Sequence, residues 1–80
     1  MSFKELGSKA FAAKNYDEAI ENFTKAIEEN GSDHTLFSNR SASFYAKQDF
    51  EKALADAEKC IEVKPDWGKG YIRKGLALQA

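Results

Sequence analysis

The chain is short of the residues that most often mark a covalent framework or a metal site. Its 80 residues include one cysteine, one histidine, one proline and five glycines. The single cysteine, Cys60, has no partner for an internal disulfide, which favours a reducing, cytoplasmic location. With only one histidine and one cysteine, we expect no metal and no other cofactor. Few chain-breaking residues favour long helices.

A strong charge excess and long apolar runs are also lacking. Twelve lysines and arginines oppose thirteen acidic residues, for a net charge of −1. This balance predicts neither nucleic acid nor membrane as a partner. No apolar run reaches membrane-spanning length, and the amino terminus has no signal-peptide pattern. With 42% hydrophobic and 31% charged residues, the composition predicts one small globular domain.

What the chain does contain is an internal repeat. Shifted by 34 residues, it aligns with itself without gaps, so that Phe3 falls on Phe37 and then on Tyr71. Ala19 likewise falls on Ala53. Small residues recur where helices are expected to approach closely: Gly7, Ser41, Gly75, Ala19, Ala26, Ala53 and Cys60. We therefore expect a stack of helix pairs that bury one continuous apolar stripe.

The pattern predicts an all-α fold with five helices, the first (A) and second (B) helix of two full repeats and the A helix of a third. Their expected spans are about 2–14, 16–29, 34–47, 49–63 and 67–79. Asn15, Ser32 or Asp33, and Asp66 are candidate caps, and Asp49 opens the fourth helix. We expect one domain over 1–80, a fragment of a longer protein, with repeats at 1–33, 34–67 and, partially, 68–80.

Charge is sorted by helix. The A helices together carry net positive charge and the B helices net negative charge. If the A helices line a concave surface, this predicts a basic groove for an acidic, extended ligand. The simpler alternative is that these charges only solvate outer faces.

The repeat resembles the tetratricopeptide repeat family over the whole chain. In the first repeat the matching residues are Leu6, Gly7, Tyr16, Ala19, Phe23 and Ala26. In the second they are Ser41, Phe44, Phe50, Ala53, Cys60 and Pro65. The chain departs from the family pattern at Gly31, where proline is usual, and at Ala57, where an aromatic residue is usual. The resemblance implies a right-handed superhelical solenoid of helix-turn-helix repeats.

Within that family, the chain is similar to the carboxylate-clamp subgroup, which binds the free C-terminal Glu-Glu-Val-Asp of cytosolic chaperones. Lys4, Asn39, Lys69 and Arg73 match the clamp by motif position, and Ser8 stands where the family has an asparagine. The resemblance implies that these five residues bind peptide. It also implies a groove floor made of Phe11, Ala42, Tyr45 and Leu76.

Two stretches, Phe37–Ser41 and Lys64–Tyr71, are similar to the first repeat domain of the co-chaperones that organise heat-shock proteins 70 and 90. That domain favours heat-shock protein 70. The implied partner is therefore the C-terminal tail of cytosolic heat-shock protein 70 and, less so, of heat-shock protein 90.

Other functions stay open or are disfavoured. Two alternatives stay open. One is a structural repeat scaffold that grips another protein segment, and the other is the targeting module of a larger enzyme such as a phosphatase. The chain itself is not expected to be an enzyme: His34 is expected to be a surface or capping residue, and Ser8 and Ser41 lack a base at usable spacing.

The last predicted helix has an apolar face with no following helix in this sequence. We expect Tyr71, Leu76 and Leu78 to be uncovered there. We expect the isolated domain either to self-associate through this helix or to hold the helix loosely.

Overall fold

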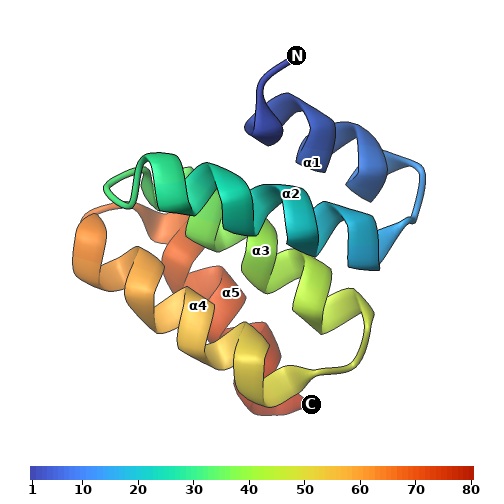
Figure 1. Ribbon diagram of the computed structural model, residues 1–80. Coiled ribbons are helices and arrows are strands. Elements are labelled where there is room, and N and C mark those ends of the chain that lie inside the picture. Colours follow the sequence, from blue (N-terminus) through green and yellow to red (C-terminus); the bar gives the residue numbers. More distant parts are fainter.

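The computed structural model describes all 80 residues and contains five helices and no strands (Figure 1). They are α1 (Phe3–Ala12), α2 (Tyr16–Glu29), α3 (His34–Ala46), α4 (Phe50–Val63) and α5 (Gly68–Gln79). The all-α prediction is confirmed, and every predicted helix is present with ends displaced by two residues at most. None of the five helices combines the length and hydropathy that a bilayer-spanning segment requires.

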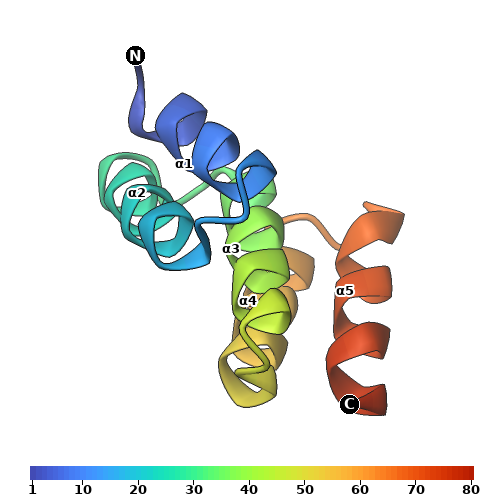
Figure 2. The ribbon, with the colours of Figure 1, turned by 90° about the vertical axis from the view of Figure 1, so that its right-hand side faces the viewer.

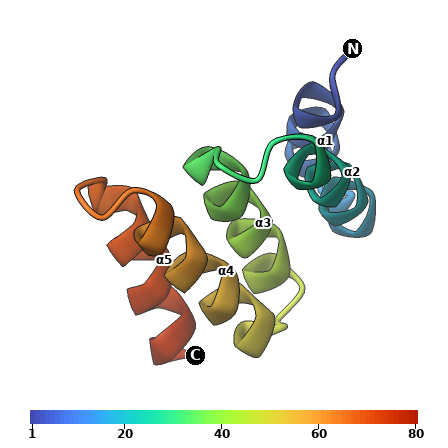
Figure 3. The same cartoon turned by 60° about the vertical axis from the view of Figure 1, so that its left-hand side comes forward.

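Neighbouring helices in the chain pack against each other, and the pairs stack in sequence. Figure 3 shows the α1–α2 pair at one end of the stack and α5 at the other, with α3 and α4 between them. The A helices α1, α3 and α5 also meet across repeats, since α3 contacts both of the others (Figure 2). Because α1 and α5 do not contact each other, they flank α3 and leave one side of it open.

Glycine allows close helix contact at two places. A Cβ atom on Gly7 would lie 2.7 Å from the ring of the buried Phe23, so any larger residue would overlap α2. A Cβ on Gly70 would lie 3.1 Å from Ile61. The expected close approach at Gly75 is wrong, because nothing surrounds that position. Gly75 corresponds to Gly7 in the repeat, but no neighbouring helix packs against α5 at that position.

Three of the five helices begin with a side-chain cap. The hydroxyl of Ser2 accepts from the backbone N–H of Glu5, and the Glu5 carboxylate accepts from the N–H of Ser2, which closes a capping box at α1. This cap was not predicted. Asp33 caps α3 and Asp49 caps α4, each through a carboxylate oxygen that accepts a backbone N–H.

The other two predicted caps are wrong. Asn15 occupies the cap position of α2, but its amide makes no capping hydrogen bond. Only its backbone carbonyl receives a helix N–H, that of Ala19. Asp66 lies one residue too early, because Trp67 takes the cap position of α5. The Asp66 carboxylate pairs instead with Lys64, at 3.6 Å.

Candidate functional site

The open side of α3 carries two adjoining clefts, which together we call the groove. The large cleft, of about 210 Å3, is lined by Phe11, Ser41, Ala42, Tyr45, Ala46, Arg73 and Leu76. The small cleft, of about 100 Å3, is lined by Ser8, Phe11, Phe23, Asn39, Ala42 and Arg73. Because Phe11, Ala42 and Arg73 line both clefts, the two are continuous. The groove is built by α1, α3 and α5, the three A helices.

The structure brings together most of the residues predicted from the sequence. The four predicted floor residues, Phe11, Ala42, Tyr45 and Leu76, all line the large cleft. Three of the five predicted clamp residues, Ser8, Asn39 and Arg73, line the small cleft. Lys4 and Lys69 line neither. The groove therefore has an apolar half and a polar half that meet at Arg73.

Arg73 is held where the two clefts join. Its Nε donates to the hydroxyl of Ser38 at 3.2 Å, and Ser38 is only 1% exposed. This anchor on α3 fixes the direction of a side chain that comes from α5. Arg73 forms no ion pair within the chain, so its remaining guanidinium N–H groups and its charge face the groove without a carboxylate partner.

Lys69 lies one turn before Arg73 on the same face of α5. Its ammonium is 5.9 Å from the centre of the Trp67 ring and forms no ion pair. A cation on a flexible stem over an aromatic face is held weakly, so the Lys69 ammonium is mobile.

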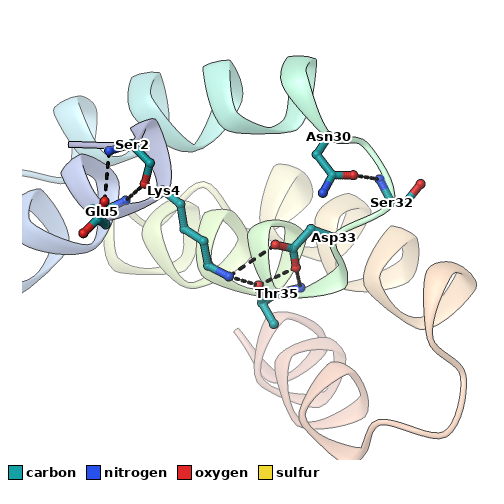
Figure 4. A network of polar contacts seen from close by, with 7 residues as sticks. All are labelled: Ser2, Lys4, Glu5, Asn30, Ser32, Asp33 and Thr35. Atoms are coloured by element: carbon teal, nitrogen blue, oxygen red, sulfur yellow. Dashed lines mark hydrogen bonds and ion pairs between the residues drawn. The ribbon is translucent and has the colours of Figure 1, made fainter.

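Lys4, by contrast, already forms hydrogen bonds within the chain. Its ammonium donates to the carboxylate of Asp33 at 3.2 Å and to the hydroxyl of Thr35 at 2.9 Å (Figure 4). Burial alone raises the pKa of Asp33, but the hydrogen bonds from Thr35 and Lys4 outweigh it and leave that pKa below its ordinary value. The position of Asp33 just before α3 predicts a cap, and the sequence alone gives no signal for its contact with Lys4.

Not every cation of the A helices faces the groove, so the charge sums over whole helices overstate its positive charge. Arg40 of α3 forms two hydrogen bonds of 2.8 Å with Asp56 of α4, on the side of α3 that faces the B helices. Lys74 of α5 likewise pairs with Glu58 of α4, at 3.7 Å. A helix presents several faces, so a sum over its residues adds charges that point in opposite directions. Arg73 is the one cation that lines the groove, and Lys4 and Lys69 lie outside both clefts.

His34, Cys60 and Ser41 all make structural contacts. The His34 ring packs edge-on against Trp67, with centroids 4.5 Å apart. Cys60 is fully buried, and burial raises the pKa of its thiol. The Ser41 hydroxyl donates to the carbonyl of Ala53 at 2.7 Å. No group of three histidine, cysteine or acidic side chains comes together in a way that could hold a metal ion.

Comparison with known sequences agrees with this architecture. The family profile described as tetratricopeptide repeat matches residues 5–33 and 36–66. The chain is 53% identical to the protein STIP1 homolog of Dictyostelium discoideum over 76 residues, covering 95% of this chain and 14% of that protein. It is 50% identical to heat shock protein STI1 of Saccharomyces cerevisiae, covering 94% and 13%. The chain thus spans about a seventh of these relatives.

Solved structures show the same fold. The TPR2B domain of yeast Sti1, in its pHsp70 complex, superimposes with a TM-score of 0.94 at 30% identity, covering 96% of this chain and 62% of that one. The second TPR domain of human RPAP3, in complex with the HSP70 peptide SGPTIEEVD, gives 0.92 at 30% identity, covering 95% and 63%. A superposition distinguishes a structure from its mirror image, so this chain has the same handedness as these tetratricopeptide repeat domains. The predicted right-handed solenoid is confirmed. The chain belongs to the tetratricopeptide repeat family.

Proposed function

We propose that this chain is a peptide-binding co-chaperone module of the cytosol, not an enzyme. Its groove binds the acidic C-terminal Glu-Glu-Val-Asp segment of heat-shock protein 70, with heat-shock protein 90 as the second partner. The observation that carries the proposal is the convergence of Ser8, Asn39 and Arg73 on one small cleft that opens into an apolar one.

The chemistry of the cleft suits the end of such a peptide. A terminal aspartate presents two carboxylates, one on the main chain and one on the side chain. Arg73 supplies a planar fork of donors, and Asn39 supplies two N–H donors and one acceptor beside a peptide backbone. Lys4 and Lys69 add mobile positive charge on either side. Ser8 is shorter than an asparagine, so we expect its hydroxyl to reach the ligand through a water molecule.

The large cleft suits an apolar side chain of the same peptide. Its walls are the aromatic rings of Phe11 and Tyr45 and the aliphatic Ala42 and Leu76. Phe11, Tyr45 and Leu76 are each about one third exposed, so a ligand side chain placed among them removes apolar surface from water. The valine that precedes the terminal aspartate is the residue we assign to this cleft.

The names of the similar structures support this choice of partner. Two were determined with a peptide of heat-shock protein 70, and one of those peptides is SGPTIEEVD. Another, the first TPR domain of Spaghetti (RPAP3), was determined with the HSP90 peptide SRMEEVD. Each of these domains is about 30% identical to this chain.

Titration with these two peptides tests the proposal. We expect SGPTIEEVD to bind in the micromolar range and more tightly than SRMEEVD, with amide chemical-shift changes concentrated on Ser8, Asn39 and Ala42. Shift changes confined to α2 and α4 would contradict the groove assignment. Absence of binding by both peptides would instead favour a scaffold that grips a different protein segment, or the targeting module of a larger enzyme.

A further inference from the structure

We propose that Asp33 is an internal competitor for the clamp lysine, so that an acidic ligand binds Lys4 against the opposition of a carboxylate of the domain itself. The inference rests on the proposed function and adds a residue that sets the affinity of the site. Asp33 lies outside both clefts and none of the clamp positions includes it.

The competition follows from the contacts of the Lys4 ammonium. An ammonium has three N–H donors, and two of them are already directed to Asp33 and Thr35 (Figure 4). A ligand carboxylate can take the third donor or displace one of the first two. In both cases it comes close to the negative charge of Asp33, 3.2 Å from the same ammonium, and like charges at such separations repel.

Asp33 cannot move away without cost. One of its carboxylate oxygens accepts the backbone N–H of Thr35 at 3.0 Å, which is the cap of α3. The same oxygen accepts the Thr35 hydroxyl at 2.6 Å. That hydroxyl proton is therefore directed at Asp33, and a lone pair of the Thr35 oxygen faces Lys4. Asp33 is therefore held in place by the cap of α3. The Thr35 oxygen, which accepts from Lys4, holds the ammonium beside Asp33.

Lys4 is the only proposed clamp cation with such a competitor. Lys69 and Arg73 form no ion pair, whereas Lys4 is joined across the repeat boundary to the start of α3. Binding at the α5 side of the groove is therefore unopposed, and binding at the α1 side is opposed. The Asp33 side chain is 23% exposed and Lys4 46% exposed, so the opposition is partly screened by water.

The test is the affinity of SGPTIEEVD for Asp33→Asn. Asparagine keeps the size and the capping oxygen and removes the charge. We expect this variant to bind roughly twofold to fivefold more tightly than the wild type, the range that a half-exposed ion pair supports. Asp49→Asn is the matched control, because Asp49 is also a helix cap with the same charge, on α4 and away from Lys4. It should change the affinity by much less.

A second variant and a second background separate the possible causes. Thr35→Val removes the hydroxyl and leaves the backbone cap, and it should also tighten binding. In a Lys4→Ala background, Asp33→Asn should give no more gain than Asp49→Asn. If Asp33→Asn equals Asp49→Asn in the wild-type background, or binds more weakly than the wild type, the competitor role is wrong and the proposed function stands. If the wild type does not bind the peptide, both are wrong.

Discussion

At the scale of single residues, α5 carries two proposed clamp cations that have no internal carboxylate partner, Lys69 and Arg73. We expect Lys69→Ala and Arg73→Ala each to weaken binding of SGPTIEEVD about tenfold or more, because each removes a charged hydrogen bond worth roughly 1.5–3 kcal/mol. The control is Lys59→Ala on α4, whose ammonium pairs with Glu62 at 3.4 Å on the far side. Calorimetry of the three variants checks this. An equal loss at Lys59 would show that only the overall charge matters.

Asp33 also makes the domain sensitive to acid. Its pKa in the folded state lies below the ordinary value of 3.8, because the hydrogen bonds from Thr35 and Lys4 outweigh its burial. A carboxyl with a depressed folded pKa stabilises the fold at pH values above its unfolded pKa, and this contribution is lost as the pH falls through the folded pKa. We expect the difference in free energy of unfolding between wild type and Asp33→Asn to be present at pH 6 and to shrink below about pH 3.8.

Urea unfolding at several pH values measures that difference. Hydrogen bonds with Ser2 also lower the pKa of Glu5. Because Glu5 is the same in both proteins, its contribution to the free energy of unfolding cancels in the comparison. A difference that stays constant from pH 6 to pH 2 would show that the charge of Asp33 does not stabilise the fold.

At the scale of helices, two glycines at equivalent repeat positions have opposite roles. Gly7→Ala would place a methyl group 2.7 Å from the Phe23 ring, and we expect it to cost about 1–3 kcal/mol of stability. Gly75→Ala meets open space within α5, so it should stabilise the domain by about 0.5–1 kcal/mol through helix propensity. Thermal unfolding of both variants checks this. The same sign of change for both would contradict the packing described for α1 and α2.

The helices were predictable because the 34-residue repeat contains the same helix pair twice, as α1–α2 and as α3–α4. Tyr16 and Phe50 begin α2 and α4, and Lys14 and Gln48 before them share a positive φ of 64° and 67°. The capping box at Ser2 was visible as a serine followed three residues later by a glutamate, but it was overlooked. Asn15 shows the converse error, because the residue type predicted a side-chain bond that is absent, although its backbone angles match those of Asp49, which does form one.

The groove was predictable only in part. Motif position placed Ser8, Asn39 and Arg73 on facing A helices, and the structure brings them to one cleft. Summing charge over helices could not show that Arg40 turns toward Asp56, because the face of each side chain depends on packing. Nor could spacing along the chain bring Lys4 and Asp33 together, since they are 29 residues apart and meet across a repeat boundary.

At the scale of the whole molecule, α5 leaves an apolar surface uncovered. Tyr71 is 51% and Leu78 61% exposed on one face of the helix, beside Ile72 at 60%. Leu76, at 36%, is exposed as expected, but it lines the large cleft on the side of α5 that faces α3. Contiguous exposed apolar residues favour association, so self-association through α5 stays a prediction.

Sedimentation velocity over a range of concentrations tests this surface. We expect the wild-type domain to self-associate as its concentration rises, and Leu78→Glu to remain monomeric. Because α5 also carries Lys69 and Arg73, association should lower the apparent peptide affinity. A wild-type domain that is monomeric throughout, with α5 amides as protected from exchange as those of α3, would contradict the prediction.

The central claim is that the groove recognises a free carboxylate terminus. The most direct measurement is the affinity of SGPTIEEVD beside the same peptide ending in a C-terminal amide, at one pH and one salt concentration. Amidation removes a charge and leaves donors of the small cleft without a partner. We expect a loss of roughly tenfold to a hundredfold, or about 1.5–3 kcal/mol. Equal affinity for the acid and the amide would contradict the account.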